Sequence, residues 1–245
     1  MLAIIGGTGL TRLSTLAVAH REVVRTPYGE PSAALVFGQL AGRDAVFLAR
    51  HGHGHTIPPH RVNYRANLWA LKQRGASAVI AVASVGAISG CAPGDLVVPH
   101  QLIDYTAGRA HTFFDGADQK VVHVDFTQPY ASSLRGRVVA AAAAGGLAIV
   151  DGGVYGAVSG PRLETAAEID RMEKDGATLV GMTGMPEAAL ARELELPYAV
   201  VCVVVNHAAG RGDSALQISM ENIAKVLATA MDRVHALLSR LASIA

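Results

Sequence analysis

Short runs of consecutive apolar residues alternate along the chain with longer stretches that have helical spacing or are rich in alanine. The runs predict strands at residues 2–5, 45–49, 78–83, 95–98, 153–158, 178–182 and 198–205. The stretches between them predict helices at residues 62–74, 131–144, 164–174, 186–195 and 220–242. Strands that are apolar at successive positions are buried on both faces, which is typical of a largely parallel sheet covered by helices.

No linker, low-complexity tract or internal repeat divides the chain. Its 245 residues suffice for one large core, so we expect a single α/β domain over residues 1–245. In sheets of this kind, ligands bind beyond the carboxyl ends of the strands. The chemistry is therefore sought where the apolar runs end.

Three of these ends carry groups that suit a small anion. The glycine-rich turn Gly6–Gly9 lets backbone N–H groups and a threonine hydroxyl approach a phosphate, although a plain tight turn is the alternative. A dinucleotide is not favoured, because Arg12 stands where that fingerprint needs a third glycine. Arg50 offers a guanidinium fork to phosphate oxygens, with a surface ion pair as its alternative role. Ser84 adds a hydroxyl, or forms a simple serine turn.

Arg50 is followed by His51, His53 and His55, which alternate with glycines. This cluster keeps a metal-dependent hydrolase open as an alternative. A zinc site usually adds Cys, Asp or Glu ligands on fixed elements, and none is patterned nearby. We therefore expect no metal here and favour anion binding by Arg50.

Polar residues also follow three later runs. Glu164 lies just past residues 153–158 in an apolar neighbourhood, where the ordinary interpretation is an acid favoured at a helix N-terminus. Thr183 follows the next run, and Asn206 closes the last one. A polar group at the end of a buried strand must be hydrogen-bonded to protein or to ligand. Together, the anion-suited ends, a lone acid and a lone amide predict a small-molecule site that uses phosphate.

Composition narrows the classes of partner. Hydrophobic residues make up 51% and charged residues 17%, which excludes a disordered chain. With 21 Lys and Arg against 20 Asp and Glu, and only 5% aromatics, neither a nucleic acid nor an anionic membrane is an expected partner. Cys91 and Cys202 have no CxxC partner and are expected to be buried free thiols. The first residues lack a basic region and a cleavage site, so a cytoplasmic location is expected.

The strand-end segments together resemble the trimeric purine nucleoside phosphorylase and methylthioadenosine phosphorylase family. The resemblance extends from Ile4 to the last helix, and its N-terminal half is most similar to the methylthioadenosine branch. The segments that carry it are Ile4–Leu10, Thr26–Ser32, Ala49–Gly52, His55–Ile57, Val62–Leu71 and Pro93–Asp95. It implies a single α/β domain with a central mixed sheet. It also implies reversible phosphorolysis of a purine nucleoside to a free base and a ribose 1-phosphate.

Site residues follow from the same resemblance, position by position. The positions that match phosphate contacts are Thr8, Arg50, His51 and Thr183. Met182 matches a position on the ribose hydroxyls, and His123 matches one that reaches into a neighbouring subunit's site. A homotrimer with shared active sites is therefore implied. Inorganic phosphate is the implied co-substrate, and no cofactor, metal or covalent nucleophile is needed.

Several positions depart from the methylthioadenosine pattern. Ser84 follows Ala83 where the family has a Thr-Ala pair, and its hydroxyl is expected to replace the lost one. Glu164 and Asn206 match the base-reading pair of the 6-oxopurine nucleoside phosphorylases, whereas the adenine branch has aspartates at positions 206 and 208. Leu163 is expected to line the same substrate site.

Met220 falls where ordinary nucleoside phosphorylases place a histidine that holds the 5′-hydroxyl. Its flexible thioether suits a methylthio group, and Ile218 is expected to add to the same lining. An ordinary helix-core role is the alternative for both residues. The whole combination implies phosphorolysis of a 5′-methylthio nucleoside of hypoxanthine.

Other interpretations remain open at this point. Within the family, the alternatives are a general inosine and guanosine phosphorylase and a methylthioadenosine phosphorylase. Outside it, they are a metal-dependent hydrolase built on the histidine cluster and a module that binds nucleosides without turnover. Phosphate dependence and release of free base discriminate between these classes.

Overall fold

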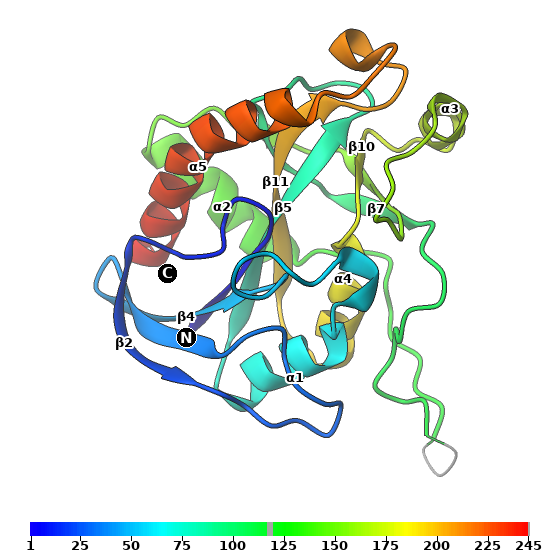
Figure 1. The fold of residues 1–245 in the computed structure, drawn as a ribbon. Coiled ribbons are helices and arrows are strands. Elements are labelled where there is room, and N and C mark those ends of the chain that lie inside the picture. The colour runs from blue at the N-terminus through cyan, green and yellow to red at the C-terminus, as the bar shows by residue number, and fades with distance from the viewer. Residues whose placement is uncertain (117–119, 245) are drawn as a thin grey trace.

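Eleven strands form one mixed sheet in the computed structural model, which describes residues 1–116 and 120–244 (Figure 1). The strands are β1 (Leu2–Gly6), β2 (Leu16–Glu22), β3 (Leu35–Leu40), β4 (Arg43–Ala49), β5 (Ala78–Ala87), β6 (Leu96–Val98), β7 (Gln101–Asp104), β8 (Val150–Asp151), β9 (Val154–Ala157), β10 (Leu179–Gly181) and β11 (Tyr198–His207). The helices are α1 (Tyr64–Gln73), α2 (Ser132–Ala144), α3 (Ala166–Lys174), α4 (Gly184–Glu193) and α5 (Met220–Ser243), with 3-10 turns η1 (Pro59–Arg61) and η2 (Gly212–Ser214). The predicted α/β class, with a mixed sheet flanked by helices, is confirmed.

Strand β5 is the branch point of the sheet. One path runs β2-β3-β4-β1-β5-β10-β9-β7, and β11 joins β5 off this path and leads on to β6 and β8. β1 pairs in parallel with β4 and β5, and β11 pairs in parallel with β5. The carboxyl ends of these four strands therefore share one edge, as expected. β10 is antiparallel to β5 and parallel to β9. β9 and β10 therefore run in the opposite direction to β5.

Two strands are longer than the apolar runs predict. β5 continues to Ala87 instead of ending at residue 83, and β11 continues to His207. Ser84 and Gly86 have the composition of a turn, but pairing with β10 and β11 keeps them in strand. The interpretation of Ser84 as part of a serine turn is therefore wrong, because this residue lies inside β5.

Four short or peripheral strands, β2, β3, β7 and β8, were not predicted. β2 exposes most of its side chains at the edge of the sheet, and β8 exposes both of its residues. β7 has no fully buried residue, and Gly38 and Gln39 interrupt the apolar run of β3. A continuous apolar run marks only those strands that are covered on both faces.

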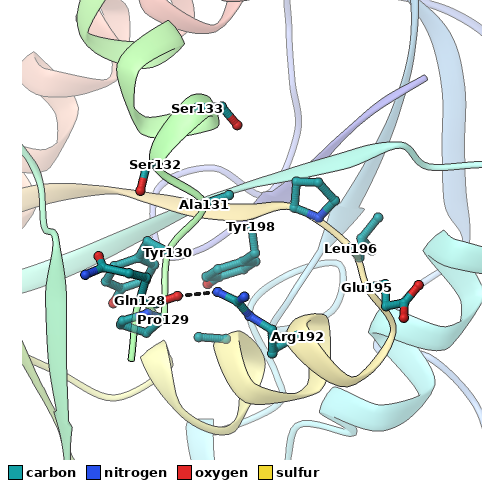
Figure 2. A pocket seen from close by; sticks show the side chains of 12 residues that line it. Gln128, Pro129, Tyr130, Ala131, Ser132, Ser133, Arg192, Glu195, Leu196 and Tyr198 are labelled. Carbon is teal, nitrogen blue, oxygen red and sulfur yellow. Dashed lines mark hydrogen bonds between the residues drawn. The ribbon is translucent and has the colours of Figure 1, made fainter. Parts of the chain in front are cut away.

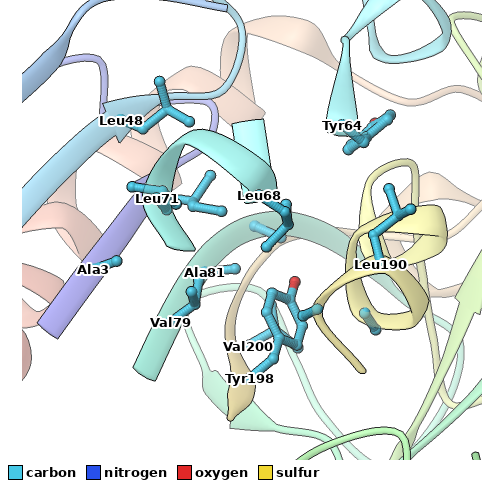
Figure 3. Close-up of a cluster of buried hydrophobic side chains, with 14 of the residues drawn as sticks. Ala3, Leu48, Tyr64, Leu68, Leu71, Val79, Ala81, Leu190, Tyr198 and Val200 are labelled. Carbon is cyan, nitrogen blue, oxygen red and sulfur yellow. The ribbon is translucent and has the colours of Figure 1, made fainter. Parts of the chain in front are cut away.

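Alternate residues of the central strands face opposite sides of the sheet and fill two cores. On one side, β1, β5 and β11 pack against α1 and α4 (Figure 3). Residues at the centre of this core are Ala3, Leu68, Leu71, Val79, Ala81, Leu190 and Val200. On the other side, the same strands pack against α2 and α5, and the residues there include Ile4, Ile80, Leu134, Val138, Val201, Val234 and Leu237. Full burial of one such larger apolar side chain contributes about 1.5–3 kcal/mol, so both helical layers fix the strand ends firmly.

Helices of the described chain, residues 1–116 and 120–244, include none that is both long and apolar enough to cross a membrane. Cys202 is buried and Cys91 is only half-buried, and both are free thiols in this structure. The expectation that both thiols are buried is therefore met by Cys202 alone.

Candidate active site

Arg50 directly follows β4 and is almost completely buried, with 1% of its surface exposed. Its Nε donates to Glu187 Oε2 at 2.7 Å, and its Nη2 donates to Glu187 Oε1 at 2.8 Å. Its Nη1 donates to the carbonyl oxygen of Val82 at 2.9 Å. Each Nη atom carries a second hydrogen, so among the described residues both retain a donor for a further acceptor.

Glu187 lies in the first turn of α4 with no exposed surface. The hydroxyl of Tyr198 also donates to its Oε1 at 2.8 Å. Burial alone lowers the pKa of Arg50, but the attraction of the Glu187 carboxylate more than offsets this and the net pKa is raised. The two charges cancel, so Arg50 offers directed N–H groups at this site and little net positive charge.

The turn that follows β1 closes directly over this guanidinium. A Cβ atom on Gly7 would lie 2.8 Å from Arg50 Nη1 and 2.5 Å from the Val82 carbonyl oxygen, so only glycine permits the approach. On the neighbouring strand β5, the hydroxyl of Ser84 donates to the carbonyl oxygen of Thr8 at 3.4 Å. The structure therefore brings Thr8, Arg50 and Ser84 together at one end of the sheet.

His51 follows Arg50 and is 5% exposed. Its Nδ1 lies 2.8 Å from the carbonyl oxygen of Ile57. Because a carbonyl only accepts hydrogen bonds, Nδ1 carries the hydrogen. Burial, followed by the charge of Arg50, lowers the pKa of His51 to about 4. At neutral pH the ring is therefore uncharged, and its Nε2 presents a lone pair.

The other two histidines of the cluster do not complete a metal site with His51. The rings of His51 and His55 lie 4.5 Å apart, and His53 is exposed. Across residues 1–116 and 120–244, no three or more His, Cys, Asp or Glu side chains are grouped so that they could hold a metal ion.

β10 leads the chain back along β5 towards Ser84. Val180 pairs with Gly86, and a Cβ atom on Gly181 would lie 3.0 Å from Val85 Cγ1. Because β10 runs in this direction, the residues that follow it lie near the residues that follow β1 and β4. The prediction located these residues correctly at a strand end, but it assumed a parallel strand.

Thr183 and Met182 occupy this return. Thr183 is 7% exposed and is the N-cap residue of α4, the helix that carries Glu187. Met182 is half-buried and lies against Gly160, where a Cβ atom would be 2.4 Å from the methionine sulfur. The segment after β9 is thereby brought next to the segment after β10.

Glu164 lies between β9 and α3 and is half-buried. Desolvation by burial raises the pKa of its carboxyl group above the usual value. Because α3 begins at Ala166 with Thr165 as its N-cap, Glu164 precedes the helix and is not a first-turn acid. It lines a cavity of about 630 Å³ together with Ser159 and Gly160. Leu163 is 39% exposed.

The direction of the Asn206 side chain is set by an irregularity in β11. The pairing with β5 shifts register between Val204 and Asn206, which is a β-bulge that re-aims the following side chain. The amide faces Gly86, where a Cβ atom would lie 3.4 Å from Asn206 Nδ2. Nδ2 donates to the carbonyl oxygen of His207 at 2.6 Å, and the residue lines a cavity of about 290 Å³.

Glu164 and Asn206 thus line different cavities in this structure, although their segments touch. A Cβ atom on Gly210 would lie 2.8 Å from Cβ of Ala166, the first residue of α3. Arg211 reinforces the contact, because its Nη2 binds Asp170 at 2.8 Å and Glu173 at 2.7 Å. The segment after Asn206 is therefore tied to the helix that follows Glu164.

Three predicted residues are not placed in this grouping: Met220, Ile218 and His123. Met220 is 66% exposed at the start of α5, and Ser219 and Asn222 line the Asn206 cavity in its place. Ile218 is half-buried. His123 is exposed and lies in residues 120–131, which lead to α2.

A separate cavity of about 520 Å³ lies at the amino end of β11 (Figure 2). Its walls include Tyr198 and the first turn of α2, and Arg192 donates to the carbonyl oxygen of Gln128 across it. None of the predicted site residues lines it. Asn206 lies at the other end of β11.

Sequence reasoning missed two side chains that fix Arg50, namely Glu187 and Tyr198. An acid after Pro186 reads as an ordinary first-turn residue, and Tyr198 reads as part of an apolar strand. One feature of the sequence could have revealed the burial of Glu187: the residues that follow it are Ala-Ala-Leu-Ala, so this acid stands at the start of an apolar helix. Such an acid requires a buried partner.

The model of the phosphorylase superfamily matches residues 1–243 of the chain. A protein of Pseudomonas syringae pv. tomato named "Probable S-methyl-5'-thioinosine phosphorylase" is 55% identical over 242 residues, which cover 98% of each chain. A protein of Thermococcus kodakarensis named "Probable 6-oxopurine nucleoside phosphorylase" is 46% identical, with 85% of this chain and 80% of that protein covered.

Among solved structures, the methylthioadenosine phosphorylase from Schistosoma mansoni in complex with adenine superposes with a TM-score of 0.95. It is 30% identical to this chain, and the match covers 99% of this chain and 91% of that one.

Proposed function

Because the chain belongs to the phosphorylase superfamily, a family of nucleoside phosphorylases, we propose that it cleaves S-methyl-5′-thioinosine with inorganic phosphate. The products are hypoxanthine and 5-methylthioribose 1-phosphate. The observation that carries the choice of base is the pair Glu164 and Asn206, placed on segments that touch through Gly210 and Ala166. The relative that is 55% identical over 98% of the chain supports the same substrate.

In the proposed reaction, a phosphate oxygen forms a bond to C1′ of the ribose while the bond between C1′ and N9 breaks. The electron pair of that bond leaves with the purine, through a ribosyl transition state with oxocarbenium character. Phosphate is both the nucleophile and the anion that faces the developing cation. The protein contributes positioning and electrostatics.

The phosphate contacts fall to Thr8, Arg50, His51, Ser84 and Thr183. Arg50 supplies the remaining hydrogen on each Nη atom, held in a fixed direction by Glu187. The neutral His51 ring presents Nε2 as an acceptor, which suits the hydroxyl of a monoprotonated phosphate.

On the nucleoside side, Met182 lies under the ribose hydroxyls. An ionised Glu164 accepts the N1–H of hypoxanthine, and Asn206 hydrogen-bonds N7 and O6 as negative charge develops on the leaving base. The raised pKa of Glu164 fits a carboxyl group held in a desolvated place until a donor arrives.

We also propose that the enzyme is a homotrimer in which His123 enters a neighbouring subunit's site. The segment that carries His123 supports this assembly, because its side chains Val121, Val122 and Val124 are 80%, 43% and 37% exposed. Exposed apolar side chains in a row mark an interaction surface. Light scattering on the purified protein tests this assembly, and a fully active monomer would contradict it.

One assay tests the substrate: release of free base from methylthioinosine, methylthioadenosine, inosine and guanosine, each with and without phosphate. We expect phosphate-dependent release of hypoxanthine, fastest from methylthioinosine. Release without phosphate supports a hydrolase, and binding without release supports a sensor. Equal efficiency on inosine supports the general 6-oxopurine phosphorylase, which the relative from Thermococcus kodakarensis makes the second candidate.

A further inference from the structure

Arg109 joins two segments that the proposed reaction uses separately. It lies on the loop that follows β7 and is half-buried. Its Nη1 donates to the carbonyl oxygen of Met185, and its Nη2 donates to the carbonyl oxygens of Ser159 at 2.8 Å and Val158 at 3.4 Å. One guanidinium therefore ties the end of β9 to the first turn of α4.

The two tied segments carry different parts of the candidate site. Ser159 opens the loop that leads to Glu164, the proposed reader of the base. Met185 follows Met182 and Thr183, the proposed ribose and phosphate contacts. β9 and β10 already pair up to Ala157 and Gly181, and Arg109 adds the side-chain link between the segments that continue beyond this pairing.

The surroundings of Arg109 suit a clamp and not an ion pair. The ring of Tyr64 lies beneath it, with the guanidinium carbon 5.3 Å from the ring centre, and the Tyr64 hydroxyl lies 3.5 Å from Nη1. Within residues 1–116 and 120–244, no carboxylate approaches within 4.0 Å of it. A planar fork that reaches two carbonyls at once is specific to arginine, because lysine is a single point donor.

We propose that Arg109 is a positioning residue that sets the Glu164 loop against the start of α4, and so determines base selectivity. This inference rests on the proposed function. Loss of the clamp frees the loop, so an intact carboxylate at Glu164 no longer meets the N1–H of the base. Arg50, the main proposed phosphate contact, is held by hydrogen bonds to Glu187 and to the carbonyl oxygen of Val82, and Arg109 takes part in neither. We therefore expect phosphate binding to change less than base selectivity.

The test compares wild type with Arg109→Met and Arg109→Lys. Wild-type turnover of methylthioinosine with phosphate tests the proposed function on its own. For both variants we expect the nucleoside KM and the calorimetric Kd for hypoxanthine to rise about tenfold, as for the loss of a charged hydrogen bond. The preference for methylthioinosine over methylthioadenosine should fall by a similar factor, while the phosphate KM changes by less than about threefold.

Arg233→Met is the matched control. Arg233 is also half-buried and bridges two carbonyl oxygens, those of Gly94 and Ala148, both at 2.8 Å, but it contacts none of the predicted site residues. We expect it to lower the melting temperature without changing selectivity. Three outcomes would each overturn the proposal. They are wild-type selectivity in both Arg109 variants, wild-type selectivity in Arg109→Lys alone, and an equal loss of selectivity in Arg233→Met. If the methionine variant does not fold, the lysine variant alone decides between these outcomes.

Discussion

The two halves of the candidate site differ in how completely this chain builds them. In the phosphate half, Arg50, His51 and Thr183 are 1%, 5% and 7% exposed. In the nucleoside half, Leu163 is 39% exposed and Met220 is 66% exposed. The three phosphate-side residues are therefore buried, whereas Leu163 and Met220 lie at the surface.

The difference follows from where each half is anchored. The residues proposed to contact phosphate follow β1, β4 and β10 or lie in β5, and Arg50 among them is fixed by a buried network with Glu187 and Tyr198. Among the residues proposed to contact the nucleoside, Met182 and Glu164 lie on segments joined by a few side chains and close glycine contacts, whereas Asn206 lies next to a bulge at the end of β11. A rigid phosphate half supplies preorganisation, whereas local stability is lower at loops with few buried contacts. Each half therefore responds differently to mutation and pH.

The largest expected effect concerns the nucleoside half. Adenine has no N1–H for an ionised Glu164 and presents a 6-amino donor where hypoxanthine has an acceptor. Sites built around such hydrogen bonds discriminate by about 10⁴ in kcat/KM. We expect a preference of that order for methylthioinosine over methylthioadenosine, measured as phosphate-dependent base release.

Asn206→Asp is expected to shift this preference towards adenine by about tenfold to a hundredfold, from the cost of one mismatched buried group. Its phosphate KM should stay unchanged, which separates the two halves. Equal wild-type rates on the two nucleosides would contradict the assignment of Glu164 and Asn206 to base recognition.

The next effect concerns the phosphate half. Arg50→Ala leaves Glu187 buried without its cation, and breaking a buried pair in this way costs about 3–5 kcal/mol of the free energy of unfolding. Loss of a charge-assisted contact to phosphate also raises the phosphate KM and lowers turnover, by about tenfold to over a hundredfold. Chemical denaturation and steady-state kinetics measure the two losses separately.

Arg74→Ala is the control for this experiment. Arg74 pairs with Glu22 at the surface, with side chains 38% and 35% exposed, so its removal should cost no more than about 1 kcal/mol. His53→Ala, at an exposed residue of the histidine cluster, should leave activity unchanged. Wild-type phosphate dependence in Arg50→Ala would place Arg50 outside the site, and a severe loss in His53→Ala would revive the metal hydrolase.

The same contrast explains how much the sequence could predict. The core strands and helices were predicted because burial gives them a continuous or periodic apolar pattern. Arg50 and Thr183 became candidates because they follow such runs, and the structure does place them after β4 and β10. The partner of Arg50 was not predicted, since Glu187 is 137 residues away and pairs only in three dimensions. The exposure of Met220 was not predicted either, because its position relative to Asn206 depends on the loop between them. Arg109 gives no sequence signal, since backbone carbonyls are its partners.

A smaller effect is expected from pH. In the proposed mechanism, base binding needs Glu164 ionised. Because burial raises the pKa of this carboxyl group, hypoxanthine affinity should fall as pH is lowered, beginning above the ordinary range of a glutamate. His51 has a pKa of about 4 and stays neutral between pH 5 and 8, so it adds no titration to the phosphate half. Calorimetry of hypoxanthine binding measures the first effect without phosphate present. In Glu164→Gln the decline with falling pH should disappear, and its persistence would assign it to another group.

The ionisation of Glu164 has opposite effects on base binding and on the stability of the unliganded protein. A carboxyl whose pKa is raised by folding stabilises the folded protein below its unfolded pKa, and this contribution is lost as pH rises through the folded pKa. Without ligand, Glu164→Gln should therefore be slightly more stable than wild type near neutral pH. Thermal unfolding at several pH values measures this difference.

The smallest expected effect concerns the exposed end of the nucleoside half. Met220 begins α5 and does not line the Asn206 cavity, whereas its neighbours Ser219 and Asn222 do, and we propose that the 5′ end of a nucleoside bound there lies against Met220. Burial of a methylthio group against the thioether gains about 0.8 kcal/mol for each methyl-sized group, whereas a 5′-hydroxyl without a partner costs about 1–3 kcal/mol. Met220→His supplies a polar partner and should narrow the preference for methylthioinosine over inosine by about tenfold. Leu216→His, at a fully exposed residue of the same loop, is the control and should leave the ratio unchanged. An unchanged ratio in Met220→His would mean that the 5′ group is read elsewhere, and equal wild-type efficiency on both substrates would favour the general 6-oxopurine phosphorylase.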